Sequence, residues 1–317
     1  MPLHPVIQTA LAAGAGMPAY SDLPIAQARA QARKAYPVNP APVAVGAVRN
    51  IRIPGPGGDM AVRLYTPCAQ GPHPMVVFFH GSGFVLLDLD THDDICRRLC
   101  AGASCLVASV DYRLAPEHKF PAAPDDCLAA VRWLAANAAQ IDADATQMAV
   151  AGDSAGGCLA AVTALRIRDE GGPALRGQLL FYPVTDYPSA PGNSYNAFGT
   201  GYGLTSQGTL WFWSQYLADL SAAGNPYASP LRSQTTASLP SACVLVAEYD
   251  VLHDEGRAYA NLLRKGGVPV FERSYAGMNH GFLKYAGVVS EASAAVRDAC
   301  DWLKTIMQTE PARASHG

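Results

Sequence analysis

Short, continuous apolar runs recur along the chain, and stretches with a helical pattern lie between them. Such runs are typical of strands that are buried on both faces of a parallel sheet. They occupy residues 75–79, 105–110, 148–151, 179–181 and 243–246. Helical stretches between them include residues 125–137 and 256–265. This alternation predicts an α/β protein whose mostly parallel central sheet carries helices on both faces.

A hairpin is expected before the first apolar run. Residues 48–53 and 60–65 alternate apolar and polar side chains around the Gly/Pro-rich turn 54–58. This pattern predicts two antiparallel, half-buried strands at the amino-terminal side of the sheet. Because ligands bind at the carboxyl ends of strands in sheets of this type, reactive side chains are expected directly after the apolar runs.

Composition limits the classes of protein that fit. The chain has 317 residues, half of them apolar, which suffices for one large core with an elaboration. A net charge of −3, with 15% charged residues and no basic block, indicates no nucleic-acid partner. The chain has no uninterrupted apolar segment long enough for a membrane span. Its amino-terminal residues lack the positively charged region of a signal peptide. We therefore expect a cytoplasmic protein without a membrane partner.

The eight cysteines are scattered along the chain and form no paired C-x-x-C sets. Cys96 and Cys100 lack the second pair that a structural zinc site requires. Free Cys is among the most buried residue types, so we expect buried thiols and no metal or other cofactor.

A Gly-rich motif, Gly-Asp-Ser-Ala-Gly-Gly at residues 152–157, separates an apolar run from an Ala/Leu-rich helical stretch. Alone, it fits a plain strand-to-helix turn that glycines and a capping residue form. It equally fits a nucleophile elbow, Gly-X-Ser-X-Gly, which exposes the hydroxyl of Ser154 above the sheet. The choice depends on whether the chain also supplies a base, an acid and an oxyanion hole.

An acid and a base follow Ser154 in the chain. Asp250 ends the apolar run 244–249, and His280 lies in a Gly-containing loop further on. The order Ser, Asp, His is the one expected of α/β-hydrolases, in which His280 would take the serine proton and Asp250 would orient the imidazole. Asp254 shares the loop with Asp250, but its position fits the first turn of the following helix.

His-Gly-Ser-Gly-Phe, residues 80–84, directly follows the run 75–79. Acyl transfer develops negative charge on a carbonyl oxygen, and the N–H groups of a Gly-rich loop stabilise such a charge at close range. The position of this loop after a central strand predicts an oxyanion loop.

Together these motifs resemble the hormone-sensitive-lipase family of bacterial carboxylesterases, and they occur in the family's order over residues 45–305. The segments that carry the resemblance are residues 80–84, 111–123, 152–157, 250–256 and 280–282. The resemblance implies an α/β-hydrolase fold with a helical cap. It also implies hydrolysis of short- to medium-chain acyl esters without a metal, and a homodimer is plausible on the same ground.

By the family's pattern, Ser154 is the nucleophile, Asp250 the acid and His280 the base. The amides of Ser82, Gly83 and Ala155 form the oxyanion hole in this pattern. Two positions depart from it, because Ser82 and Val251 stand where the family usually has glycine and proline.

We expect four parts along the chain. Residues 1–45 would form N-terminal cap helices, residues 46–183 and 226–310 the catalytic core, and residues 184–225 a cap insertion. Residues 311–317 would be a frayed tail. The expected substrate pocket comprises Phe84, Tyr182, Tyr202, Trp211 and Phe212.

Other polar residues near these motifs are expected to have structural roles. Arg113, Glu117 and Asp126 are interpreted as a charge network that braces the oxyanion loop. His118 and His253 are interpreted as surface residues.

The predicted function is that of a carboxylesterase acting on small-molecule esters through a covalent acyl-enzyme. An amidase, lactonase or carbamate hydrolase stays open, because the same side chains attack any activated acyl group. A catalytically silent hydrolase fold that serves as a small-molecule receptor is disfavoured, since all three triad residue types are present.

Overall fold

The computed structural model describes residues 2–36, 39–81, 83–188 and 193–308. Within these ranges, eight strands form one sheet in the order β1-β2-β4-β3-β5-β6-β7-β8. The first two strands form the predicted antiparallel hairpin, and β2 also pairs antiparallel with β4. The pairings from β4 through β3 to β8 are parallel. The predicted mostly parallel sheet with an N-terminal hairpin is therefore confirmed.

The strands have the following bounds: β1 Ala47–Gly55, β2 Gly58–Thr66, β3 His73–Phe79, β4 Leu106–Val110, β5 Ala143–Asp153, β6 Leu175–Phe181, β7 Ser241–Tyr249 and β8 Val270–Asn279. Every apolar run singled out in the sequence lies in or directly beside one of the central strands β3 to β7. β8 was not among those runs, because as an edge strand it has several exposed side chains in its first half. Because polar and apolar residues are mixed in its first half, β8 contains no continuous apolar run of the kind that marks the central strands.

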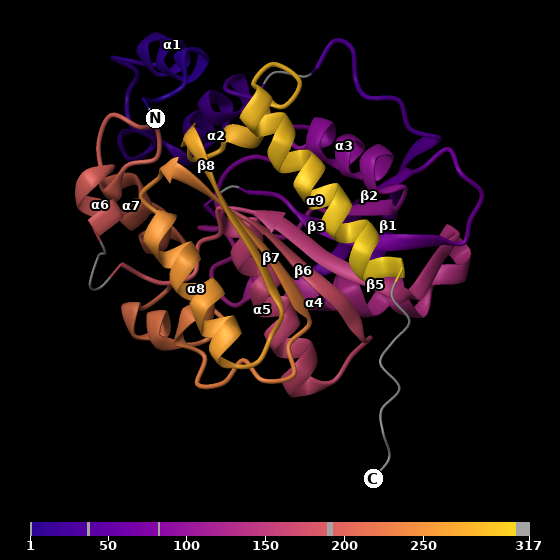
Figure 1. Cartoon of the computed structure of the whole chain (residues 1–317). Coiled ribbons are helices and arrows are strands. Elements are labelled where there is room, and N and C mark those ends of the chain that lie inside the picture. The colour runs from indigo at the N-terminus through magenta and orange to yellow at the C-terminus, as the bar shows by residue number, and fades with distance from the viewer. Residues whose placement is uncertain (1, 37–38, 82, 189–192, 309–317) are drawn as a thin grey trace.

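Helices cover both faces of the sheet (Figure 1). α3 (Asp93–Ala103) and α9 (Ser290–Gln308) pack on one face, where a core cluster contains Phe78, Leu99 and Leu303. α4 (Ala122–Ala136), α5 (Ala155–Glu170) and α8 (His253–Lys265) pack on the other, where a second cluster contains Val131, Leu159 and Tyr259. Each face of the parallel sheet is thus shielded from water, as a sheet of this kind requires.

The remaining helices gather at one end of the sheet, near the end of β8 (Figure 1). They come from two distant parts of the sequence: α1 (Pro5–Ala13) and α2 (Ile25–Lys34), and α6 (Asn193–Ala197) and α7 (Ser206–Tyr216). The two parts touch, since the rings of Tyr20 and Phe212 lie 6.4 Å apart. Short 3-10 helices cover Tyr20–Asp22, Ala138–Ile141, Leu220–Gly224, Pro230–Arg232 and Phe282–Tyr285.

All eight cysteines are free thiols. Seven are buried as predicted, whereas Cys68 is exposed. Among the described residues, no helix has the length and apolar character that a membrane crossing requires. The predicted frayed tail, residues 311–317, lies outside the described residues.

Candidate active site

Ser154 lies at a sharp turn between β5 and α5. β5 ends at Asp153, α5 begins at Ala155, and Ser154 between them has φ 55° and ψ −119°. A non-glycine residue with this backbone is strained by about 1–3 kcal/mol, and such strain is held only where the surroundings over-determine it. The Ser154 amide donates to the Phe181 carbonyl at 2.8 Å, which ties the turn to the neighbouring strand β6.

The glycines around Ser154 are required by close backbone contacts. A Cβ at Gly152 would lie 2.2 Å from the carbonyl oxygen of Gly156, and one at Gly156 would lie 1.9 Å from that of Phe79. Only glycine lets β5, α5 and β3 approach this closely. The strained serine and its flanking glycines have the geometry of a nucleophile elbow and not of a plain helix cap.

The structure brings Ser154, His280 and Asp250 together. The His280 Nε2 atom lies 2.8 Å from Ser154 Oγ, and Nδ1 lies 2.8 Å from Asp250 Oδ2. The other carboxylate oxygen of Asp250 accepts the Leu252 amide at 2.9 Å. Asp250 is 1% exposed and Ser154 is 9% exposed, so the three residues connect a fully buried carboxylate to a serine that solvent barely reaches.

Asp254 does not face His280. Its Oδ2 atom accepts the Ser194 amide at 2.9 Å, which connects it to α6. Asp254 is in the first turn of α8, as its sequence position predicts. Geometry therefore separates the two candidate acids of this loop, and only Asp250 contacts the imidazole.

Glycines of the loop after β3 approach the elbow. The Gly81 amide donates to Asp153 Oδ1 at 2.7 Å, and a Cβ at Gly81 would collide with the same carboxylate. Gly83 has φ +58°, and a Cβ there would lie 2.2 Å from the Phe212 ring. Ser82, the predicted oxyanion residue between these glycines, lies outside the described residues. Ala155, the third predicted oxyanion residue, is the first residue of α5.

Two buried histidines pack beneath this loop. His92 Nε2 lies 3.2 Å from Asp153 Oδ1, and the rings of His80 and His92 lie 5.5 Å apart. Burial, with a smaller effect of His92, lowers the pKa of His80 to about 3, so His80 is neutral at physiological pH. Burial alone would raise the pKa of Asp153, but His92 and the Gly81 amide hold it below its ordinary value. Asp153 is therefore an ionised, hydrogen-bonded carboxylate next to Ser154.

The motif at residues 111–123 braces this region, with one correction to the predicted network. The Tyr112 hydroxyl donates to the His80 carbonyl at 2.7 Å, and Arg113 pairs with Asp126 at 2.8 Å. Glu117 is not part of that pair. It binds Arg29 of α2 at 2.7 Å instead, because the N-terminal helix lies over this motif.

Arg29 also donates to the carbonyl oxygens of Val85 at 2.9 Å and Ala115 at 3.1 Å.

The surface interpretation of the two histidines is correct for His118, which is exposed. It is wrong for His253, which is half-buried and has Nδ1 2.8 Å from the Ala247 carbonyl oxygen. Turns of the chain that end a strand recruit such side chains to satisfy buried carbonyl groups.

The predicted pocket residues divide into two groups. Phe84 and Tyr182 are buried: Phe84 stacks on Tyr216 with ring centroids 3.8 Å apart, and Tyr182 meets the His280 ring edge-on at 4.9 Å. Tyr202, Trp211 and Phe212 are partly exposed. Of these, Phe212 touches Gly83, and the Tyr202 carbonyl accepts from Asn279, the neighbour of His280.

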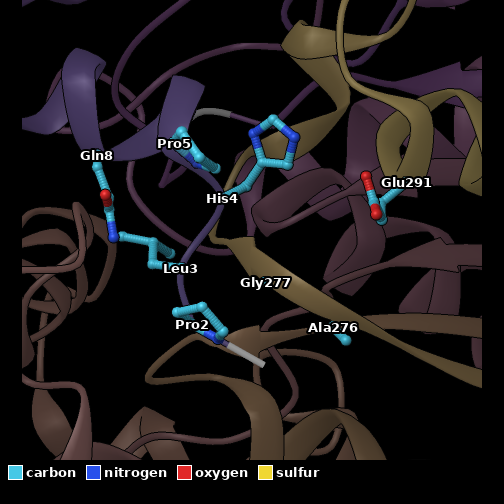
Figure 2. A pocket seen from close by; sticks show the side chains of 8 residues that line it. All are labelled: Pro2, Leu3, His4, Pro5, Gln8, Ala276, Gly277 and Glu291. Carbon is cyan, nitrogen blue, oxygen red and sulfur yellow. The ribbon is translucent and has the colours of Figure 1, made fainter.

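The amino-terminal segment runs beside β8, close to His280. The His4 amide donates to the Gly277 carbonyl at 2.9 Å. Figure 2 shows residues of this segment next to Ala276 and Gly277 of β8. Together they line a cavity of about 290 Å³. Ser154, Asp250 and His280 do not line this cavity.

Several side chains at the site were not singled out in the sequence. They are His92, Asn279 and Asp153. Asp153 lies in the motif at residues 152–157, but no role was assigned to it. Asp153 had a signal, namely its fixed place beside Ser154 in the motif. His92 and Asn279 had none, because their contacts depend on loops that meet only in the folded chain.

Comparisons with known proteins identify the fold family of the chain. A family model described as alpha/beta hydrolase fold matches residues 76–284. The esterase LipI of Mycobacterium tuberculosis is 44% identical over 264 residues, which cover 82% of each chain. An ethyl acetate hydrolase of Pseudomonas putida is 38% identical over 74% of this chain and 75% of its own.

A solved structure is similar over nearly the whole chain. It is a hyperthermophilic esterase from the archaeon Pyrobaculum calidifontis, with a TM-score of 0.92 and 39% identity. The match covers 96% of this chain and 99% of that one. With the serine elbow and the family match, these likenesses establish an enzyme of the serine hydrolase type with carboxylic ester hydrolases as relatives. The chain belongs to the α/β-hydrolase fold family, in its hormone-sensitive-lipase-like branch of carboxylesterases.

Proposed function

We propose that this carboxylesterase hydrolyses its substrates through a covalent acyl-enzyme on Ser154. The supporting observation is the continuous contact Ser154–His280–Asp250, with two distances of 2.8 Å. His280 takes the proton of Ser154 while Oγ attacks the ester carbonyl carbon, and Asp250 stabilises the imidazolium that forms. His280 then gives this proton to the leaving alcohol, and the acyl group stays on Ser154.

Water completes the cycle. His280 takes a proton from the water, whose oxygen attacks the acyl carbon, and returns it to Ser154 as the carboxylic acid leaves. In both steps the carbonyl oxygen becomes an oxyanion. The backbone amides of Gly83 and Ala155, with that of Ser82 expected from the motif, are the proposed donors to it.

An organophosphonate tests the nucleophile. It should label the wild-type enzyme with one equivalent at Ser154, and Ser154→Ala should be unlabelled and lose activity by at least about 10⁴-fold. Thr163→Val, a buried hydroxyl further along α5, is the matched control and should be labelled normally. Labelling at another residue, or esterase activity that survives in Ser154→Ala, would overturn the mechanism.

Residues 1–45 and 184–225 are proposed to form a cap over the site. Support comes from Phe212 against Gly83 and from Arg29 on the loop carbonyl of Val85. We expect such a cap to enclose an aromatic pocket of limited depth, which would favour soluble esters with roughly four to eight acyl carbons. Turnover of nitrophenyl esters of increasing chain length measures this, and faster hydrolysis of emulsified long-chain triglyceride would contradict it.

The competing activity is hydrolysis of an amide, lactone or carbamate by the same residues. Matched nitrophenyl esters and nitroanilides with one acyl group distinguish these chemistries. We expect kcat/KM to be higher for the ester by several orders of magnitude. The amide bond of the anilide is less reactive than the ester bond, and its leaving nitrogen needs more help from a general acid.

A further inference from the structure

Glu255 is a buried carboxyl group that the proposed chemistry does not use. It is the third residue of α8, five positions after Asp250, and is 8% exposed. Its Oε1 atom accepts the amide of Thr185 at 2.7 Å, and Oε2 accepts the Tyr195 hydroxyl at 2.8 Å. In the described part of the chain, no Lys or Arg pairs with it. Burial without a cation is costly for an ionised carboxylate, so Glu255 depends on these hydrogen bonds to the insertion.

The groups that bind Glu255 all belong to the insertion 184–225. The Thr185 hydroxyl also donates to the Glu255 carbonyl at 2.9 Å. Nearby, Ser194 Oγ donates to the Val251 carbonyl at 2.7 Å, and the Ser194 amide binds Asp254. Residues Thr185, Ser194 and Tyr195 of the insertion are therefore fastened to the first turn of α8 and to Val251 in the loop that follows Asp250.

Further along, the same insertion reaches the other parts of the site. The Tyr202 carbonyl accepts from Asn279 Nδ2 at 2.9 Å, next to His280, and the Phe212 ring lies against Gly83. A shift where the insertion is fastened would consequently move the groups that surround Ser154. Packed elements transmit such shifts because protein interiors are nearly incompressible.

We propose that Glu255 is a positioning residue, which fixes the cap insertion on the first turn of α8, directly after the Asp250 loop, and thereby sets which acyl groups fit over Ser154. This inference rests on the proposed function, since it assumes that acyl transfer takes place at Ser154. Glu255 acts through Thr185 and Tyr195 and does not touch the substrate.

The protonation state of Glu255 suggests a conservative variant. Burial raises its pKa to about 8, while the Thr185 amide and the Tyr195 hydroxyl oppose the rise. Glu255 is therefore mostly the neutral acid near pH 7. Glutamine has the same shape and can still accept the Thr185 amide and bond to Tyr195. Alanine removes these contacts and a longer one of 3.4 Å from the Asp186 amide.

The test compares Glu255→Ala and Glu255→Gln on nitrophenyl esters from acetate to octanoate. Phosphonate titration first gives the concentration of competent sites, so that unfolded enzyme does not count. In Glu255→Ala, KM for the preferred ester should rise about tenfold, and its kcat/KM advantage over acetate should fall at least about fivefold. Its kcat on acetate should stay within about threefold, and Glu255→Gln should keep the wild-type selectivity within about twofold.

Thr236→Val provides the matched control. Thr236 is buried and donates to the Leu262 carbonyl at 3.0 Å, at the far end of α8. This variant loses one hydrogen bond on the same helix but none to the insertion, and its selectivity should equal that of the wild type. If Glu255→Ala does not fold, Tyr195→Phe removes only the hydroxyl contact and should shift selectivity in the same direction by about fourfold, which exceeds the margin allowed for Glu255→Gln.

Unchanged selectivity per competent site in Glu255→Ala, or in Tyr195→Phe if the alanine variant fails to fold, would overturn the inference. A purely structural role lowers the number of labelled sites without changing KM or the ester ratio. Failure of the proposed function is a separate result, because there the wild-type enzyme itself would not be labelled at Ser154.

Discussion

The Asp153 carboxylate accepts the Gly81 amide hydrogen at 2.7 Å and so joins the residue before Ser154 to the Gly-rich loop after β3. His92 Nε2 lies 3.2 Å from the same carboxylate oxygen. The buried Asp153 side chain therefore fixes the position of the proposed nucleophile relative to the loop that carries the proposed oxyanion donors. An oxyanion hole depends on donors that are placed before the reaction, because reorganisation during the reaction would cost energy.

Removing this carboxylate should therefore impair the chemical step. Asp153→Ala frees the Gly81 amide, and kcat should fall by about 10²-fold, comparable to the loss of one oxyanion donor. Asp153→Asn keeps an acceptor for Gly81 and should retain more activity than the alanine variant. Rates per phosphonate-labelled site measure this. Equal kcat in Asp153→Ala and the wild-type enzyme would show that the loop needs no such support.

The two acids that follow β7, Asp250 in the loop and Asp254 in the first turn of α8, should differ in their effect. Asp250→Asn leaves the shape intact but loses the charge that stabilises the His280 cation, so kcat should fall about 10³- to 10⁴-fold. Asp254→Asn should cost less than about tenfold, because an amide oxygen can still accept the Ser194 amide. Steady-state kinetics on a soluble butyrate ester compare them, and the opposite ranking would transfer the role to Asp254.

Gly83 is expected to tolerate no side chain while Phe212 is present. Gly83→Ala puts a methyl group 2.2 Å from the Phe212 ring and forces a non-glycine residue to φ +58°. We expect kcat/KM to fall by about 10- to 100-fold, since small displacements of donors are costly. Adding Phe212→Ala removes the collision but not the unfavourable φ, and should recover about tenfold. Additive losses in the double variant would mean that the two residues do not interact at the site.

Much of the fold follows from local patterns in the sequence. The strands β3 to β7 can be recognised in the sequence as apolar runs, because strands covered on both faces contain few polar residues. Ser154 and Asp250 were singled out because each follows an apolar run, and His280 because it comes last in the chain order Ser, Asp, His, in a Gly-containing loop. β8 lacked such a signal, since half of an edge strand faces water.

Contacts between distant segments could not be predicted in the same way. Glu117 was grouped with Arg113 because they are close in the sequence, yet its partner is Arg29, 88 residues away. The hydrogen bond from Gly81 to Asp153 spans 72 residues, and that from Tyr195 to Glu255 spans 60. Such pairs depend on how loops meet at the strand ends, which neither periodicity nor a short motif encodes.

Glu255 should make the stability of the enzyme pH-dependent. Its pKa of about 8 in the folded chain, raised by burial, exceeds the value of about 4.3 for an unfolded glutamate. Between these values the folded chain keeps a proton that the unfolded chain has released. The free energy of unfolding should thus fall as pH rises, by about 1.4 kcal/mol per unit from this one group. The negative charge of Asp186 beside it contributes to the raised pKa.

Glu255→Gln should remove this slope, because an amide does not titrate. Urea unfolding between about pH 5 and about pH 8 measures it, and the variant should gain stability relative to the wild type as pH rises. Glu272→Gln is the contrasting control: despite the cost of its burial, pairing with Arg264 and Arg257 lowers the pKa of Glu272. Its stabilising contribution is complete above the unfolded value of about 4.3, so this variant should be destabilised by a constant amount over the same range. Identical pH slopes in the wild type and in Glu255→Gln would show that Glu255 is ionised in the folded enzyme, despite its burial.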